Sequence, residues 1–167
     1  MRGKVLLLRR GTLLLILTAL VAAGIFMAVG GPGFVSASAA KRQLPIYSVE
    51  REEKVCAISF DAAWGNEDTQ ALIDILGKYN VKATFFVVGD WVDKYPESVK
   101  ALHDAGHEVM NHSLHHDHYN ALTADQVVAD VTACNEKIAA ITGVTPCLIR
   151  CPYGEYDDHV ISAIRSM

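Results

Sequence analysis

The residues best suited to chemistry are histidines gathered in one short stretch of the chain. Five of the seven histidines lie between positions 107 and 118, in the segment HEVMNHSLHHDH. Residues four apart lie on the same face of a helical turn, so His112 and His116 could bring two imidazoles to one metal ion. The same spacing also suits a solvated, histidine-rich loop. A strong metal site needs a third protein ligand and leaves positions open for water.

Other polar residues follow short apolar runs, at the points where strands would end. Asp61 follows the first run, the histidine pair follows the third, and Arg150-Cys151-Pro152-Tyr153 follows the fourth. Parallel α/β architectures gather ligands and catalytic groups at the carboxyl ends of their strands. An aspartate after a strand is also a common helix cap or turn residue, so its position alone assigns no role to Asp61.

The elements that must position these side chains alternate between strands and helices. Short apolar runs predict four strands, the first two of them buried on both faces, at 55–60, 83–88, 107–110 and 147–150. Helical periods with start and stop residues predict helices at 67–79, 96–105, 123–143 and 158–167. This order implies a parallel sheet with right-handed crossovers. Both an open doubly wound sheet and part of a (β/α) barrel are compatible with it.

The apolar spacing also predicts which faces of the helices are buried. The helix at 67–79 is expected to bury one stripe, formed by Ala71, Leu72, Ile75, Leu76 and Tyr79. The long helix opens with a capping box at Thr123 and Gln126 and ends at Gly143. Its expected buried stripe consists of Val127, Val131, Cys134, Ile138 and Ile141. Three of the four cysteines lie in apolar patterns and are expected to be buried thiols: Cys56, Cys134 and Cys147. No disulfide is predicted, and none of the four cysteines shows the CxxC spacing of a structural zinc site.

The N-terminal segment differs sharply in charge from the rest of the chain. Four cations lie in residues 1–10, and residues 11–40 carry no charge. The interpretation is a cytoplasmic basic tail at 1–12, a transmembrane or signal segment at 13–30, a linker at 31–54 and a folded domain at 55–167. The flanking charges predict a single-pass protein of the cell membrane with its domain outside. The alternative is a secreted form, released by signal cleavage near Ala39 in the small-residue run Ala37-Ser38-Ala39.

The folded part of the chain is acidic. All 19 Asp and Glu residues lie beyond Ala40, together with only 11 of the 15 Lys and Arg residues. This balance excludes nucleic acid as a partner, because neutralising phosphates requires a basic face. The chain ends at Met167 inside a helical pattern without a C-cap, so the domain is expected to be incomplete at its C-terminus.

Three motifs in this order resemble NodB-like polysaccharide deacetylases, carbohydrate esterase family four. Asn111-His112-Ser113-Leu114-His115-His116 is similar to the family's H-[S/T]-x-x-[H/P] motif. Ser59-Phe60-Asp61 resembles its first motif, and Arg150-Cys151-Pro152-Tyr153 resembles R-x-P-[Y/F]. Phe60-Asp61-Ala62-Ala63-Trp64-Gly65 is most similar to the branch found in sporulating Gram-positive bacteria. The resemblance covers residues 55–167.

The resemblance implies a fold, a reaction and a set of roles. The fold would be the N-terminal portion of a distorted (β/α) barrel, and the reaction would be metal-dependent hydrolysis of N-acetyl groups on peptidoglycan or a chitin-like polysaccharide. His112 and His116 would hold a divalent metal ion, zinc or cobalt, and Asp61 would be the general base. Arg150 would orient Asp61, and the backbone N–H of Tyr153 would stabilise the oxyanion.

Two departures from the family pattern keep other functions open. The family usually places a second Asp, a metal ligand, where this chain has Ala62, and no spacing argument selects a substitute among Glu67, Asp68 and Asp117. The family's Leu-x-His motif, which supplies the general acid, lies beyond Met167. The main alternative is therefore a catalytically impaired remnant that binds carbohydrate or metal. A further alternative is an unrelated metal hydrolase of amidase type.

Overall fold

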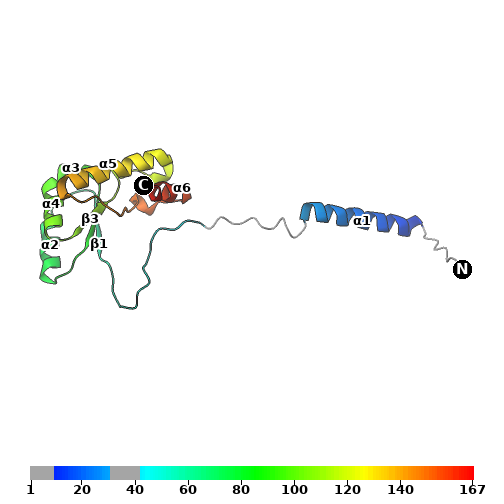
Figure 1. Ribbon diagram of the computed structural model, residues 1–167, viewed down its shortest axis with the longest axis horizontal. Coiled ribbons are helices and arrows are strands. Elements are labelled where there is room, and N and C mark those ends of the chain that lie inside the picture. Colours follow the sequence, from blue (N-terminus) through cyan, green and yellow to red (C-terminus); the bar gives the residue numbers. More distant parts are fainter. Residues whose placement is uncertain (1–9, 31–41) are drawn as a thin grey trace. The chain divides into compact units, whose positions relative to one another are not determined.

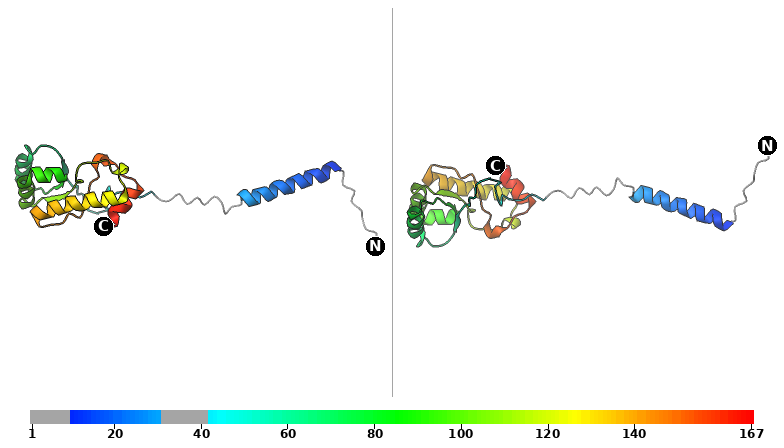
Figure 2. Two further views of the ribbon diagram at one scale, coloured as in Figure 1. Left: turned by 90° about the horizontal axis from the view of Figure 1, so that it is seen from above. Right: turned by 90° about the horizontal axis from the view of Figure 1, so that it is seen from below.

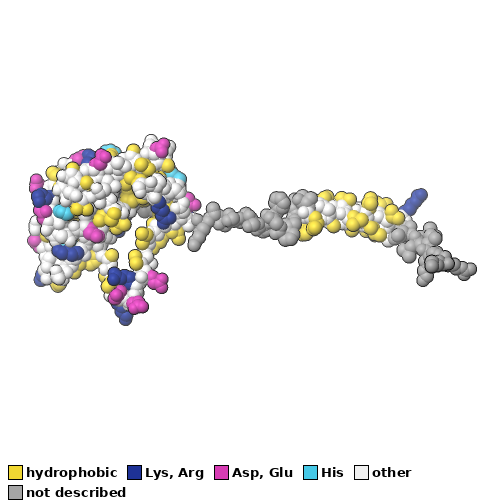
Figure 3. All heavy atoms as spheres, in the orientation of Figure 1, with side chains coloured by type: hydrophobic (Ala, Val, Ile, Leu, Met, Phe, Trp, Pro, Cys, Tyr) yellow, Lys and Arg dark blue, Asp and Glu magenta, His cyan; other side chains and the backbone are white. Residues whose placement is uncertain are grey.

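The computed structural model describes residues 10–30 and 42–167, which belong to two separate compact units (Figure 1). In the first unit, helix α1 (Arg10–Gly30) exposes a largely hydrophobic surface (Figure 3). It is long and apolar enough to cross a membrane, a test that a signal sequence also passes. Residues 1–9 and 31–41, which include the expected cleavage site at Ala39, lie outside the described residues.

The second unit, Gln43–Met167, is built on three short parallel strands. They are β1 (Ser59–Ala62), β2 (Thr84–Val87) and β3 (Glu108–Asn111), in the order β1-β2-β3. The segment expected to be a fourth strand contributes one parallel bridge, between Ile149 and Asn111. The predicted α/β fold with parallel strands is therefore confirmed, although the fourth predicted strand is reduced to a single pairing.

The helices of this unit are α2 (Thr69–Lys78), α3 (Gly89–Lys94), α4 (Pro96–Asp104), α5 (Ala124–Thr142) and α6 (Asp158–Arg165). Four of the helices pack on one face of this sheet, and the fifth, α6, packs against α5 (Figures 1 and 2). A 3-10 turn lies between β3 and α5, at Tyr119–Ala121, and another lies between α5 and α6, at Pro152–Gly154. Helix α5 contacts α3, α4, β3 and α6, so it connects the sheet to the C-terminal part of the described chain.

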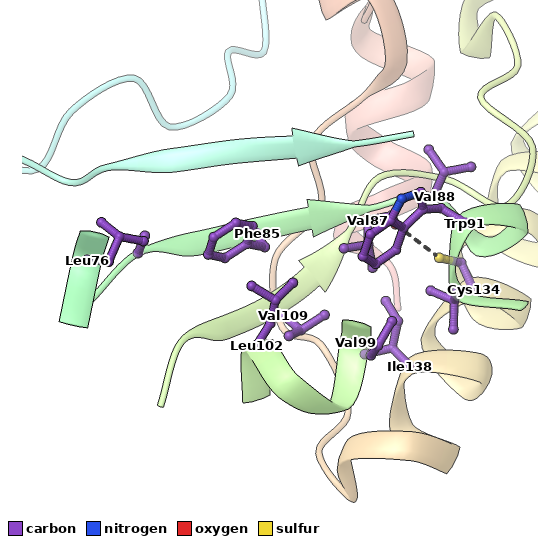
Figure 4. Packing of buried hydrophobic residues seen from close by; sticks show 12 residues of the cluster. Leu76, Phe85, Val87, Val88, Trp91, Val99, Leu102, Val109, Cys134 and Ile138 are labelled. Carbon is purple, nitrogen blue, oxygen red and sulfur yellow. Dashed lines mark hydrogen bonds between the residues drawn. The ribbon is translucent and has the colours of Figure 1, made fainter. Parts of the chain in front are cut away.

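The main core lies between the sheet and the helices α2, α3, α4 and α5 (Figure 4). Successive strand residues point to opposite faces, so Phe85, Val87 and Val109 face the helices and share one apolar cluster with Val99 of α4 and Ile138 of α5. A second, smaller cluster lies between α5 and α6 and consists of Tyr119, Val127, Val131, Val160 and Ala163. The two clusters together hold α5, and thereby the loop that precedes it, against the end of β3.

Strong local signals predicted α5 closely. The Thr123 hydroxyl accepts a hydrogen bond from the Gln126 N–H while the Gln126 side chain accepts one from the Thr123 N–H, and Gly143 ends the helix with a φ of 74°. The predicted stripe of Val127, Val131, Cys134 and Ile138 is buried, and Ile141 is half-buried. This prediction is confirmed because the capping box and the left-handed glycine fix both ends of the helix.

Other predictions of burial are wrong, each for a packing reason. The first strand begins at Ser59 rather than at 55, and residues 55–58 are exposed because β1 pairs with β2 on one side only. Helix α2 buries Leu76 and partly buries Leu72 and Ile73, whereas Ile75 and Tyr79 are 55% and 68% exposed.

The cysteines follow the same division. Of the three cysteines expected to be buried, only Cys134 is; Cys56 and Cys147 are exposed, because they lie in extended segments outside the three strands. Cys151 is half-buried, and all four thiols are free.

Part of the segment expected to be a linker packs against α6. The Gln43 N–H donates to an Asp158 carboxylate oxygen at 2.8 Å, and the Arg165 guanidinium donates to the Leu44 carbonyl at 3.0 Å. The Tyr47 hydroxyl also hydrogen-bonds the hydroxyl of Tyr156. Residues 43–47 therefore belong to the folded unit through polar contacts, which an apolar periodicity does not reveal.

One buried histidine makes the stability of this fold depend on pH. His107, directly before β3, is 4% exposed, and its Nδ1 accepts a hydrogen bond from the Ala83 N–H at 3.3 Å. Burial, together with the nearby positive charge of Lys82, lowers the pKa of His107 below 6.5. Protons therefore bind more readily to the unfolded chain, and the stabilisation present above pH about 6.5 is lost as the pH falls from there through the lowered pKa of the folded chain.

We expect the free energy of unfolding to fall between about pH 7.5 and pH 5.5 more steeply for the wild-type chain than for His107→Asn. The asparagine keeps an acceptor near the Nδ1 position and does not titrate. Urea unfolding at several pH values, followed by the fluorescence of the buried Trp91, measures the difference. Equal pH slopes in the two proteins would contradict the assignment to His107.

Candidate functional site

The candidate site lies where β1, β3 and the bridged segment at Ile149 end on the same edge of the sheet. Asp61 is in β1, His112 directly follows β3, and Arg150 directly follows Ile149. The parallel direction of these segments brings together residues that are 89 positions apart in the chain. The sheet thus places Asp61 beside Arg150, as the motifs predict.

Arg150 is held on three sides. Its guanidinium donates to an Asp61 carboxylate oxygen at 2.6 Å and to the Ser59 hydroxyl at 2.7 Å. It also lies over the ring of Phe86, 4.3 Å from the ring centroid. The charge-assisted bond fixes the orientation of the Asp61 carboxylate, whose side chain remains 42% exposed and so is accessible to a substrate.

His112 presents one ring nitrogen to the site and uses the other to hold its position. Its Nδ1 lies 2.7 Å from the backbone carbonyl oxygen of Arg150. Because a carbonyl oxygen only accepts hydrogen bonds, Nδ1 carries the proton and Nε2 keeps its lone pair. The side chain is 4% exposed, and this burial lowers the pKa of His112. The neutral imidazole, which is the form that binds metal ions, is thereby favoured.

His116 completes the pair of imidazoles. Its ring lies edge-on to that of His112, with centroids 5.0 Å apart. The backbone at His116 is left-handed, with a φ of 61°, and its N–H donates to the Ser113 hydroxyl at 2.8 Å. Trp64 and Tyr153 also contact the His116 ring, with centroid distances of 5.6 Å and 4.6 Å. The two histidines are therefore neighbours in a loop, although the segment is not a helix.

Among the described residues, the candidate metal site consists of the imidazoles of His112 and His116. Within residues 10–30 and 42–167, no group of three or more His, Cys, Asp or Glu side chains is arranged to hold a metal ion. None of the three substitutes that the sequence leaves open for the ligand missing at Ala62 completes the site: Glu67, Asp68 and Asp117. The side chains present therefore suit a divalent transition metal as two of its ligands, with the remaining positions left to water or substrate.

Tyr153 lies beside the histidine pair in a strained backbone conformation. Its φ is 57°, and its ring is 58% exposed. The His118 ring stacks on it at a centroid distance of 4.1 Å, and His118 Nδ1 lies 3.0 Å from both carboxylate oxygens of Glu155. Non-glycine residues in this region cost free energy and persist where their surroundings fix them.

Residues that the motifs do not assign a role support the loop of residues 112–118, which we call the histidine loop. The Asn111 side chain, which is fully buried, donates to the Val131 carbonyl and to the Asn135 side chain of α5, and it accepts from the Ser113 N–H at 2.7 Å. On the other side, the Gly89 N–H donates to the Ser113 carbonyl at 2.9 Å. A polar residue directly before His112 was the available signal for Asn111.

Comparison with known proteins identifies several relatives. Residues 48–167 match the family model described as polysaccharide deacetylase. The chain is 34% identical over 122 residues to the peptidoglycan-N-acetylmuramic acid deacetylase PdaA of Bacillus subtilis (strain 168), over 72% of this chain and 46% of PdaA. It is 36% identical over 109 residues to chitin deacetylase 1 of Cryptococcus neoformans var. grubii, over 65% of this chain and 23% of that enzyme.

A solved structure resembles the chain at a similar level. It is BA3943 from Bacillus anthracis, described as a CE4 family pseudoenzyme, with a TM-score of 0.66 and 32% identity over 69% of this chain and 41% of BA3943. A mutant of BA3943 described as having restored enzymatic activity gives the same TM-score. The chain thus spans less than half the length of PdaA, of chitin deacetylase 1 and of BA3943.

The close approach of Gly89 to the loop leads to a prediction. A Cβ at residue 89 would lie 2.6 Å from Leu114 Cδ1 and 3.0 Å from the Leu114 carbonyl oxygen. We expect Gly89→Ala to displace the loop and to lower the free energy of unfolding by about 1–3 kcal/mol. Gly77→Ala in α2 is the control, because its Cβ meets nothing within 4 Å. The control should leave stability unchanged or raise it by up to about 1 kcal/mol. Urea unfolding compares them, and equal stabilities would contradict the prediction.

Proposed function

This chain belongs to the polysaccharide deacetylase family, and on that premise we propose that it carries the site for metal-dependent hydrolysis of N-acetyl groups on a cell-wall or chitin-like polysaccharide. The observation that carries the proposal is the grouping of the Asp61–Arg150 pair with His112 and His116 at one edge of the sheet. The three-stranded sheet is then the N-terminal portion of a distorted (β/α) barrel. In such folds catalytic groups gather at the carboxyl ends of the strands.

The proposed metal is a divalent ion, zinc or cobalt, held by His112 and His116. The chemistry supplied by such an ion is polarisation of the acetamide carbonyl and a lowered pKa for a bound water. The hydrogen bond from His112 Nδ1 to the Arg150 carbonyl leaves the lone pair of Nε2 available to the metal ion. The buried, neutral state of His112 supports this role.

Three further residues have roles in the hydrolysis of the amide. Asp61 takes the proton of the attacking water, and the bond from Arg150 keeps its carboxylate oriented for that transfer. The backbone N–H of Tyr153 donates to the oxyanion of the tetrahedral intermediate. The left-handed backbone at Tyr153 supports this role, because strained residues cluster where a backbone group must be aimed at a ligand.

Exposed aromatic rings beside the histidine pair support a sugar polymer as the substrate. Trp64 is 78% exposed and Tyr153 is 58% exposed, and both rings contact the His116 ring. The C–H faces of sugar rings pack on such aromatic faces. Similarity to PdaA supports peptidoglycan, and similarity to chitin deacetylase 1 supports a chitin-like polymer. The motif from Phe60 to Gly65 favours the sporulation-type branch and, with it, peptidoglycan.

A substrate of this kind lies outside the cytoplasm, which agrees with the N-terminal segment. We propose a single-pass protein of the cell membrane, anchored through residues 13–30 with its domain outside. The length and apolar character of α1 support this arrangement. A secreted form, cleaved near Ala39, is the alternative.

A second candidate function is a catalytically impaired module that binds carbohydrate or metal. Ala62 in place of a carboxylate and the two-histidine cluster of the described chain favour it. Similarity to the BA3943 pseudoenzyme also supports it. The two candidates differ in whether acetate is released, so an assay of acetate release separates them.

The proposed function predicts both metal binding and acetate release by the full chain in mild detergent. We expect Co²⁺ binding in calorimetric titrations and release of acetate from N-acetylated peptidoglycan fragments or chito-oligosaccharides. His112→Ala should lose both, whereas His115→Ala should lose neither, because His115 is half exposed and contacts Asp90 instead. Metal binding without acetate release would favour the impaired module. Equal Co²⁺ affinity in wild type and His112→Ala would contradict the proposed metal site.

A carboxylate restored at the end of β1 should strengthen the site. We expect Ala62→Asp to tighten Co²⁺ binding by roughly tenfold or more, because a charge-assisted contact contributes on the order of 1–3 kcal/mol. Ala63→Asp is the matched control, since Ala63 is also half-buried against the main core but lies one residue further along the chain. Weaker binding by Ala62→Asp, or equal effects of both variants, would count against this geometry.

A further inference from the structure

The buried carboxylate of Asp130 accepts two hydrogen bonds that fix the histidine loop. Asp130 lies on α5 and is 9% exposed. One of its oxygens accepts the Leu114 N–H at 2.9 Å and the Tyr119 hydroxyl at 2.5 Å. In the chain, these two donors lie on either side of His116. Asp130 therefore connects the segment that carries His116 to the middle of the longest helix of the folded unit.

The loop needs such a connection because its backbone is strained. Ser113 and His116 both have left-handed conformations, with φ of 76° and 61°. Non-glycine residues keep such conformations only where surrounding contacts fix them. The hydrogen bond within the loop, from the His116 N–H to the Ser113 hydroxyl, shapes the turn but does not attach it to the rest of the protein.

The two ends of the Asp130 contact are themselves immobilised. The Leu114 carbonyl accepts the Asp90 N–H of α3 at 3.0 Å, so the backbone of Leu114 is held between α3 and α5. Tyr119 is fully buried in the cluster between α5 and α6. Because Tyr119 follows His116 in the chain and Leu114 precedes it, the segment that carries His116 is fixed at both ends. Burial also makes the hydrogen bond to the carboxylate stronger than it would be in water.

From these contacts we infer that Asp130 is a positioning residue for the candidate metal site. Through Leu114 and Tyr119 it sets the separation and the angle of the His112 and His116 rings. This inference rests on the proposed function, since it concerns the metal affinity of that site. With two protein ligands, affinity depends strongly on how well the unbound rings are already placed, and groups that orient the ligands matter accordingly.

The test compares Co²⁺ binding by variants of the full chain in mild detergent. Asp130→Ala removes both contacts, and Tyr119→Phe removes one contact with little change in shape. We expect the dissociation constant to rise about 10–100-fold for Asp130→Ala and by up to about tenfold for Tyr119→Phe. Asp130→Asn, which keeps an acceptor, should recover part of the loss. The visible absorption of bound Co²⁺ should change in Asp130→Ala, because it reports the arrangement of the ligands.

Two controls separate positioning from general stability. Glu136→Gln removes an exposed acid from the same helix and should bind Co²⁺ as the wild type does. Val99→Ala opens a cavity in the main core on α4 and should lower the unfolding temperature without changing the affinity. If Val99→Ala weakens binding as much as Tyr119→Phe does, the positioning role is overturned. Wild-type affinity in folded Asp130→Ala or Tyr119→Phe overturns it as well.

A measurement without metal keeps this inference distinct from the proposed function. Hydrogen exchange of the Leu114 amide in the metal-free chain should be at least tenfold faster in Asp130→Ala than in the wild type or in Glu136→Gln. If the wild-type chain binds no Co²⁺ but the exchange rate rises as expected, the metal site fails while the loop contact stands. An unchanged exchange rate overturns the role of Asp130, whatever the metal affinity.

Discussion

The ion pair between Arg150 and Asp61 depends on the parallel direction of the segments that carry it. Asp61 lies in the first strand, and Arg150 directly follows the single bridge that Ile149 makes to Asn111. Strands running the same way end at one edge of the sheet, so side chains remote in sequence meet there. The Arg150 carbonyl in turn accepts the Nδ1 hydrogen of His112. One residue thus orients both the carboxylate and the first imidazole, and the rest of the candidate site is built around it.

The histidine loop shows how a fold stabilises a conformation that its local sequence does not favour. Ser113 and His116 adopt left-handed backbones, which are costly for residues with a Cβ. Contacts from three elements compensate for that cost: Asn111 at the end of β3, the backbone of α3 and the side chain of Asp130 on α5. Two apolar clusters hold α5 in place. The polar contacts from α5 to the loop therefore start from a rigid helix. Core packing and site geometry are therefore coupled through α5.

Local signals in the sequence were sufficient for elements that carry their own boundaries. Helix α5 was predicted with both ends and most of its buried stripe, because Thr123, Gln126 and Gly143 act through neighbouring backbone groups. The motif residues of the site were recognisable through their resemblance to the family's motifs, because the histidine spacing alone also suits a solvated loop. The first strand and the buried face of α2 were predicted less well, since an apolar run does not reveal how many neighbours will cover it. The support from Gly89 and Asp130 was not predictable, because it exists only after α3 and α5 have docked beside the loop.

The contacts of Ala62 serve the fold and do not depend on a polar side chain at this position. Its backbone pairs with Val87, its carbonyl accepts the Val88 N–H at 3.0 Å, and its methyl group packs against the main core. All three contacts are available to a small apolar residue, so the sheet forms without a carboxylate at this position. Asp61, one residue earlier, is by contrast tied to Arg150 by charge. A chain of this family can therefore keep its architecture without a carboxylate at position 62, because function resides in the site rather than in the fold. Similarity both to a protein named as a deacetylase and to one described as a pseudoenzyme is the pattern that such a separation produces.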